Sequence, residues 1–213
     1  MPSDSDWMAA CARLAERARP LARPNPGVAS LLVKDGTVIA RGWTQPGGRP
    51  HAEALALAGR EAGGAAGASL YVTLEPCAHE SQRGPACTDL VIAARPARVV
   101  IGQLDPDERT SGLGAKRIER AGIAVSVLDD GTAHASLAGY LTRASLGHPR
   151  VTLKLAMSLD GCIALKDGSS QWITGEAARA HVHAQRARHD AILVGGATLR
   201  ADRPRLDVRL PGL

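Results

Sequence analysis

The stretch Thr73-Leu74-Glu75-Pro76-Cys77 ends a short apolar run that begins at residue 69. An apolar run of this length, bounded by turn-forming residues, is typical of a buried strand. Two further segments place metal-binding residue types at the starts of predicted helices: Pro50-His51-Ala52-Glu53 and Gly84-Pro85-Ala86-Cys87. A strand end and two helix starts of this kind indicate an α/β arrangement in which the three segments converge on one site.

Strands and helices alternate on either side of these segments. Asp35-Gly36 is a turn signal that joins the first two strands as a hairpin, and Ser5 fits the N-cap of the first helix. The predicted strands cover residues 28–33, 38–43, 69–74, 98–101 and 123–127, and the predicted helices cover residues 6–18, 52–59, 87–94, 113–121 and 133–145. This alternation predicts an α/β layered domain with a largely parallel sheet.

A domain boundary is predicted at His148-Pro149. We predict a first domain over residues 1–146 and a second, incomplete domain over residues 147–213. The second domain is expected to hold strands over residues 151–157 and 191–195, with a helix over residues 175–187 that Thr174 caps. A segment of about 65 residues buries too little surface to be a dependable fold by itself.

The composition narrows the class of protein. The 213 residues are 45% hydrophobic and 22% charged, which excludes a disordered chain, and no apolar run reaches the roughly 18 residues of a membrane span. The segment Met1 to Trp7 is acidic and has no apolar core, so we expect a cytoplasmic protein without a membrane or secretory signal. Only 2% of the residues are aromatic, which argues against stacking on nucleic-acid bases.

Charge and cysteine usage differ along the chain. Residues 146–213 carry ten Lys and Arg against six Asp and Glu, whereas residues 1–145 are nearly balanced. A basic segment suits a phosphorylated small molecule or nucleic acid, and a solvated arginine-rich surface is the alternative. Four cysteines in a cytosolic chain do not imply disulfides, and the helical spacing of Cys11 places it in the core.

His51, Cys77 and Cys87 together form a set of three zinc ligands. Tetrahedral Zn²⁺ with three protein ligands keeps one position open for water, which is the pattern of a catalytic rather than a structural site. Glu53 lies two residues after His51, where it can move protons without binding the metal. A His-x-Glu segment followed by Pro-Cys and a second Cys is typical of zinc deaminases.

The spacing of the cysteines leaves alternatives open. Nine residues separate Cys77 from Cys87, where zinc deaminases commonly have two, and a long loop costs little extra free energy. His79 lies inside this loop and is either a rival metal ligand or, as we expect, a substrate contact. Cys87 alone could also be a buried helix-start cysteine.

The sequence resembles the bifunctional riboflavin-biosynthesis deaminase/reductase family of bacteria over nearly its whole length. The matching stretches in the first domain are Pro24-Asn25-Pro26, Lys34-Asp35-Gly36, residues 47–53, residues 71–77, His79, residues 85–87 and Asp105-Pro106. Those in the second are residues 153–156, 158–161, 170–174 and 191–195, Thr198 and Ala201-Asp202. The chain departs from the family pattern at Ala29, Cys162 and Arg203 and by one extra residue between Cys77 and Cys87.

The resemblance implies a fold and an activity. It implies a cytidine-deaminase-like three-layer α/β/α domain followed by the N-terminal part, about a third, of a dihydrofolate-reductase-like α/β domain. It implies zinc-dependent deamination of 2,5-diamino-6-ribosylamino-4(3H)-pyrimidinone 5′-phosphate to 5-amino-6-(5-phosphoribosylamino)uracil. The family's second domain reduces the ribosyl group with NADPH, and we expect no reductase turnover from this chain alone.

The resemblance also implies residue roles. Asn25 and His79 would hold the substrate of the first domain. In the second domain, the positions matching substrate contacts are Ser170, Arg186, Leu206 and Arg209, and those matching NADPH contacts are Ala156, Trp172, Thr198 and Asp202. Without the resemblance, Trp172 would be interpreted as a core aromatic and Arg186 as part of a solvated helix face.

Two alternative functions belong to other classes. A tRNA adenosine-type deaminase would share the zinc chemistry, but it usually keeps the short cysteine spacing and needs a basic track or stacking aromatics. A non-catalytic zinc-binding remnant would have no need of Glu53 as a proton shuttle. An incomplete second domain would expose apolar surface, which makes a homo-oligomer a further hypothesis.

Overall fold

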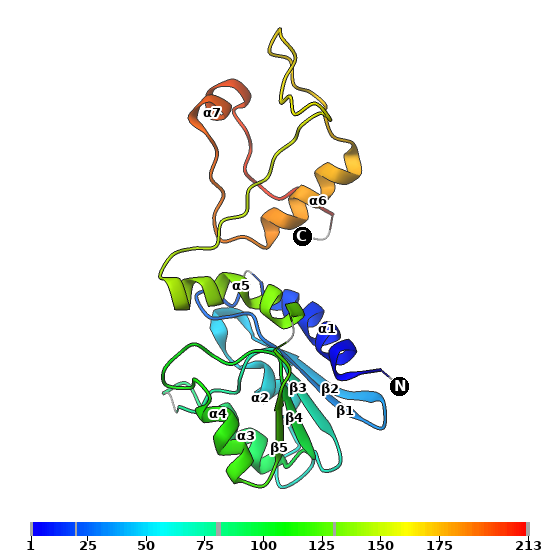
Figure 1. Ribbon diagram of the computed structural model, residues 1–213, viewed down its shortest axis with the longest axis vertical. Helices are drawn as coiled ribbons and strands as arrows, with labels where there is room; N and C mark the ends of the chain where they lie inside the picture. Colours follow the sequence, from blue (N-terminus) through cyan, green and yellow to red (C-terminus); the bar gives the residue numbers. More distant parts are fainter. Residues whose placement is uncertain (1, 20, 80–81, 130, 212–213) are drawn as a thin grey trace. The chain divides into compact units, whose positions relative to one another are not determined.

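A five-stranded sheet forms the centre of the first of two units, residues 1–150 and 151–213, in this computed structural model (Figure 1). The structure describes residues 2–19, 21–79, 82–129 and 131–211. The strands are β1 (Ala29–Lys34), β2 (Thr37–Trp43), β3 (Ser69–Val72), β4 (Arg98–Ile101) and β5 (Ala124–Val127), in the order β2-β1-β3-β4-β5.

The sheet is mixed, and the prediction of a largely parallel sheet is wrong for the pairing of β1 with β3. β1 pairs antiparallel with both β2 and β3, whereas β3–β4 and β4–β5 are parallel. The hairpin prediction is confirmed, with Asp35 and Gly36 both at positive φ between β1 and β2. Residues 44–68 then return the chain so that β3 runs antiparallel to β1, which strand patterns alone do not reveal.

Helices cover both faces of the sheet, so the three-layer arrangement is confirmed. α1 (Asp4–Ala15) and α5 (Gly131–Leu146) contact each other, and α1 packs on β1 and β3. On the other side, α2 (Ala52–Ala56) contacts β1, β2 and α3 (Cys87–Ala94), while α4 (Leu113–Arg120) contacts α3 and β5. Figure 1 shows α1 and α5 together on one side of the sheet and α3 and α4 together on the other.

The core uses small aliphatic side chains in place of phenylalanine. Leu70, Val72, Val99 and Ile101 point to the face covered by α2, α3 and α4, and all four are fully buried. The intervening residues Tyr71 and Val100 point to the opposite face, as the two-residue repeat of a strand requires. They pack in one cluster with Met8 and Cys11 of α1. The prediction that Cys11 is a core residue is confirmed.

Helix α1 begins two residues earlier than predicted, at Asp4. Ser3, rather than Ser5, is its N-cap, and Ser3 and Asp6 form a capping box. Asp4 is thus the first residue of the helix. Its carboxylate accepts hydrogen bonds from the guanidinium of Arg98, at 2.6 and 2.8 Å, and from the Tyr71 hydroxyl at 2.7 Å. This group ties α1 to β3 and β4 at one end of the sheet.

The second unit contains α6 (Glu176–Ala187) and α7 (Gly196–Asp202), and no strand is present among its residues 151–211. The predicted strands over residues 151–157 and 191–195 are therefore wrong. A strand is stable only when a neighbouring strand accepts its hydrogen bonds, and neither segment has such a neighbour. The N-cap of α6 is Gly175 rather than the predicted Thr174.

In the part of the chain that the structure describes, no helix is both long enough and apolar enough to cross a bilayer.

Candidate metal centre and active site

The three predicted metal ligands lie together at the ends of three elements. His51 is the N-cap of α2, Cys77 follows the end of β3, and Cys87 is the first residue of α3. The His51 Nδ1 atom lies 3.2 Å from Cys87 Sγ and 3.7 Å from Cys77 Sγ. All three potential ligand atoms lie within 4.8 Å of one another.

These distances fit a tetrahedral zinc ion. Zn–S bonds of about 2.3 Å and Zn–N bonds of about 2.0 Å place the donor atoms of a tetrahedral site about 3.6 Å apart. The distances from His51 Nδ1 to the two sulfur atoms bracket that value. No fourth metal-binding side chain joins this cluster in the described residues. The residues therefore match a three-ligand zinc site with one position left for water or substrate.

The helix start at Cys87 stabilises negative charge on Cys77. The Cys87 backbone N–H donates to Cys77 Sγ at 3.3 Å, and it belongs to the first turn of α3, where the helix dipole favours an anion. Hydrogen bonds from the Cys87 thiol, and then from His51, lower the pKa of Cys77 well below its usual value despite its burial. These contacts favour the thiolate form of Cys77, which is the form that binds metal.

Glu53 lies beside the metal centre but outside the ligand set. It belongs to the first turn of α2 and is only 3% exposed. Burial raises the pKa of Glu53 to about 7, although the nearby His51 ring favours the charged form. A carboxyl group that exchanges its proton near neutral pH suits general acid–base work.

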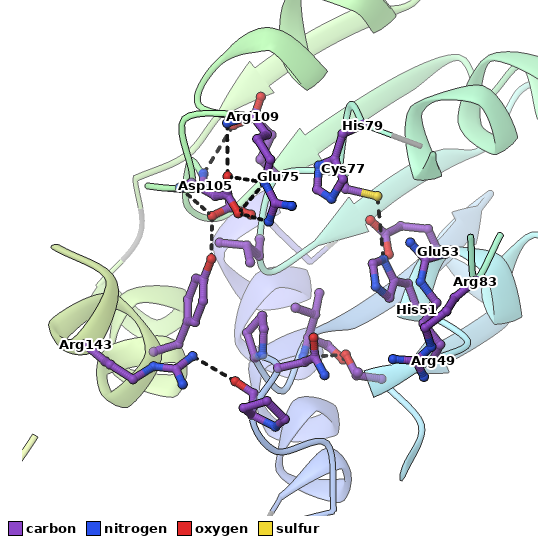
Figure 2. Close-up of a pocket in the computed structure, with 18 residues that line it drawn as sticks. Arg49, His51, Glu53, Glu75, Cys77, His79, Arg83, Asp105, Arg109 and Arg143 are labelled. Carbon is purple, nitrogen blue, oxygen red and sulfur yellow. Dashed lines mark hydrogen bonds and ion pairs between the residues drawn. The ribbon is translucent and has the colours of Figure 1, made fainter. Parts of the chain in front are cut away.

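A cavity of about 460 Å³ opens onto the metal centre and is lined by His51, Glu53 and Cys77 (Figure 2). Asn25 and His79, the predicted substrate contacts, line the same cavity. His79 lies outside the metal cluster, and its Nδ1 atom lies 3.4 Å from the Thr110 hydroxyl. The loop between Cys77 and Cys87 includes Glu80 and Ser81, which lie outside the described residues.

Sequence reasoning missed most of the polar wall opposite the metal centre. Asp105 accepts a hydrogen bond from the Tyr140 hydroxyl at 2.7 Å, and burial raises the pKa of Asp105. Arg109 pairs with Asp107 at 2.5 Å. Tyr140 comes from α5, so it is distant in sequence from every motif, and only Asp105 belonged to a stretch that carried the resemblance.

Two arginines lie on the other side of the cavity, near His51 (Figure 2). Arg49 donates to the Pro85 carbonyl at 3.4 Å, and Arg83 donates to the Gly47 carbonyl at 3.0 Å. A Cβ atom on Gly84, next to Arg83, would lie 3.2 Å from Arg49 Nη1. The two guanidinium groups thus belong to one positively charged corner, which sequence spacing did not indicate.

The predicted site residues of the second unit do not form one enclosed site. Ser170 and Trp172 line a shallow hollow of about 230 Å³, and none of the other six predicted residues lines it: Ala156, Arg186, Thr198, Asp202, Leu206 and Arg209. Trp172 is 70% exposed and stacks under Arg179, so its interpretation as a core aromatic is wrong. Arg186 donates hydrogen bonds to the backbone carbonyls of Arg205 and Asp207. Its side chain is therefore held against residues 205–207 and is not simply part of a solvated helix face.

Two family models match the chain. Residues 1–103 match the cytidine and deoxycytidylate deaminase zinc-binding region, and residues 149–213 match the RibD C-terminal domain. The mixed sheet, the three-ligand cluster and these matches define a cytidine-deaminase-like zinc-binding domain followed by a segment of a RibD-type C-terminal domain.

Three known proteins that resemble this chain in sequence or structure belong to one family. The chain is 46% identical over 209 residues to the riboflavin biosynthesis protein RibD of Escherichia coli K12, covering 97% of this chain and 56% of that protein. RibD of Acinetobacter baumannii matches with a TM-score of 0.84 and 39% identity, over 99% of this chain and 59% of that one. The diaminohydroxyphosphoribosylaminopyrimidine deaminase/5-amino-6-(5-phosphoribosylamino)uracil reductase of Thermotoga maritima matches with a TM-score of 0.87 and 36% identity, over 98% and 60%.

The chain belongs to the RibD family, which confirms the resemblance to riboflavin-biosynthesis deaminase/reductases. It spans a little more than half the length of these relatives.

Proposed function

We propose that residues 1–146 are a zinc-dependent deaminase domain acting in riboflavin biosynthesis. Its substrate is 2,5-diamino-6-ribosylamino-4(3H)-pyrimidinone 5′-phosphate, and its product is 5-amino-6-(5-phosphoribosylamino)uracil. The observation that carries this proposal is the cluster of His51, Cys77 and Cys87 beside the buried carboxyl of Glu53, all at one cavity.

His51, Cys77 and Cys87 hold the zinc ion, and Glu53 moves the protons. When bound, zinc supplies Lewis-acid activation of a water at neutral pH. The Glu53 carboxylate takes one proton from the attacking water and gives it to the ring nitrogen. It then takes the remaining proton from the new hydroxyl group as the carbonyl forms, and gives that proton to the departing amino group. The C–N bond breaks, ammonia leaves, and the carbon keeps the oxygen as a carbonyl, so one water is consumed for each ammonia released.

The cavity offers contacts for both ends of this substrate. Asn25 and His79 carry hydrogen-bonding groups suited to the pyrimidine or its sugar, and both line the cavity. Arg49 and Arg83 suit a phosphate, because guanidinium groups make charge-assisted and bidentate hydrogen bonds to phosphate oxygens. The substrate thus extends from the metal centre toward this pair.

We propose that residues 147–213 are part of a reductase domain that uses NADPH. The match to the RibD C-terminal domain supports this assignment. Ser170, Arg186, Leu206 and Arg209 are then substrate contacts, and Ala156, Trp172, Thr198 and Asp202 are NADPH contacts. Residues 151–211 form two helices and no sheet, so we expect these positions to act only within a complete domain.

The test is ammonia release from the diamino-pyrimidinone ribosyl phosphate by zinc-loaded protein, compared with its Glu53→Gln variant. We expect turnover by the wild type and a loss of about 10²- to 10⁴-fold in kcat in the variant, with zinc content unchanged. NADPH oxidation, measured in parallel, is expected to be absent. Equal rates for wild type and variant would refute the role of Glu53, and no ammonia from the wild type would refute the proposed substrate.

A further inference from the structure

Glu75 is a buried charged residue next to the metal centre that the proposed reaction does not use. It lies two residues before Cys77 and is 3% exposed. Figure 2 shows it between Asp105 and Cys77 on the wall of the cavity. Burying a carboxylate is costly unless the protein supplies hydrogen bonds, so its partners indicate what it does.

Within the described part of the chain, Glu75 accepts three hydrogen bonds, and all three donors are backbone N–H groups from one distant segment. Asp105 N and Gly112 N donate to Glu75 Oε2 at 3.2 and 2.9 Å, and Ala115 N donates to Oε1 at 2.9 Å. Asp105 and Gly112 are the two ends of the loop 105–112. One carboxylate oxygen therefore holds both ends of this loop.

The same carboxylate caps α4. Gly112 is the N-cap of that helix, has a positive φ of 77° and offers no side chain for capping. Glu75 takes the place of a capping side chain by accepting the N–H groups of Gly112 and Ala115, where the helix dipole favours negative charge. The first turn of α4 lies close to the segment that carries Glu75, because a Cβ atom on Gly114 would lie only 2.2 Å from the Pro76 carbonyl oxygen.

The loop that Glu75 holds carries much of the cavity wall opposite the metal. Asp105 accepts from Tyr140, Arg109 pairs with Asp107, and the buried Thr110 hydroxyl lies 3.4 Å from His79 Nδ1. The Thr110 contact occupies Nδ1 of His79 and leaves Nε2 for other partners. Movement of the loop would displace its own side chains together, from Asp105 to Thr110, and so break their contacts with Tyr140 and His79.

We propose that Glu75 is a positioning residue that fixes the loop 105–112, and through it the substrate-facing wall, relative to the metal ligand Cys77. Its role is to set substrate affinity rather than to bind zinc or transfer protons. Glutamine cannot replace it, because its NH₂ group would face one of the three N–H donors, and aspartate is one carbon too short. This role rests on the proposed deaminase function only for its kinetic readout.

The experiment compares Glu75→Gln with the matched control Glu119→Gln, which alters an exposed residue of α4, in the zinc-loaded 213-residue chain. Hydrogen exchange measured by mass spectrometry is expected to be at least about tenfold faster in Glu75→Gln over residues 103–116. We expect KM to rise about tenfold while kcat changes less than about threefold and zinc content is unchanged. The control should match the wild type in every readout.

Wild-type exchange and KM in Glu75→Gln would overturn the proposal, and so would a loss of zinc and kcat without a change in KM, which would place Glu75 in the metal site. If Glu75→Gln does not fold, Thr110→Val removes only the hydroxyl beside His79. A rise in KM with unchanged zinc content then supports the positioned wall, and an unchanged KM overturns it. If the wild type releases no ammonia from the substrate, the proposed function fails, while hydrogen exchange still decides whether Glu75 holds the loop.

Discussion

The two units of this chain carry functional residues in different physical settings. In residues 1–150, the ligands follow a buried strand or begin helices that pack on the sheet, and Leu70 of β3 is fully buried. In residues 151–213, Leu153 is 78% exposed and no strand supports the predicted contacts among the described residues. A family motif can be present in both units, but only a packed scaffold holds its side chains in a working geometry.

The largest expected contrast is in metal binding. Cys77→Ser removes a thiolate ligand and the charge that the Cys87 N–H stabilises. Zinc content is expected to fall from about one ion per chain to nearly none, with loss of ammonia release, because thiolate ligands dominate zinc affinity at such sites. Metal analysis after dialysis measures this effect.

Cys162→Ser is the matched control in the second unit, where this cysteine is exposed. It should leave zinc content and turnover unchanged. Full zinc occupancy in Cys77→Ser would show that the metal lies elsewhere.

The cores of the two units should respond unequally to truncation. Leu70→Ala removes a fully buried side chain and is expected to lower the free energy of unfolding by about 2–5 kcal/mol. Leu153→Ala removes an exposed side chain and should change it by less than about 0.5 kcal/mol. Urea denaturation gives both values, and similar losses in the two variants would mean that the second unit also has a consolidated core.

The arginines of the two units should differ in their effect on substrate affinity. Arg49→Gln and Arg83→Gln are each expected to raise KM about tenfold with little change in kcat, because each loses a charge-assisted hydrogen bond to the phosphate. Arg205→Gln changes an exposed arginine that pairs with Asp207 in the second unit and should have no effect. Steady-state kinetics with the phosphorylated and the dephosphorylated substrate separates loss of phosphate binding from general damage, since only the phosphorylated form should lose affinity.

The smallest effect concerns the ion pair that ties α1 to the sheet. The hydrogen bond from Arg98, aided by Tyr71, lowers the pKa of Asp4 below 3.8. Because the folded-state pKa is the lower one, the stabilisation is present above pH 3.8 and disappears as the pH falls through the folded value. Asp4→Asn is expected to cost about 1 kcal/mol at pH 7, and this difference should vanish at low pH.

The counterpart variant is Asp207→Asn, which removes the ion pairs of Asp207 with Arg205 and Arg209 in the second unit and should not change the unfolding midpoint measurably. If Asp4→Asn lowered the free energy of unfolding equally at all pH values, the stabilisation by Asp4 would come from its packing and neutral hydrogen bonds and not from its charge.

Local patterns predicted most of the first unit. Strands such as β4 and helices such as α3 begin and end as expected, because short aliphatic runs and capping positions are local signals. The antiparallel pairing of β1 with β3 was not predicted, since it depends on the path of the chain between them. In the second unit, the aliphatic run 151–157 predicted a strand that has no partner to pair with.

The metal centre was predicted more fully than the cavity around it. His51, Cys77 and Cys87 stand in recognisable motifs, because ligand chemistry restricts residue type at each position. Glu75 stands in the same motif, but its role depends on N–H groups of residues 105–115, which no spacing rule connects to it. Tyr140 reaches Asp105 only because α5 packs on the same face as α1.

The most direct test of the account is X-ray absorption spectroscopy of the zinc-loaded protein. We expect two sulfur atoms at about 2.3 Å from zinc, one histidine nitrogen at about 2.0 Å and one exchangeable oxygen at a similar distance. The same spectrum is expected for Glu53→Gln, because Glu53 is not a ligand. A second histidine nitrogen, a third sulfur or a fourth ligand supplied by the protein would contradict the open catalytic site.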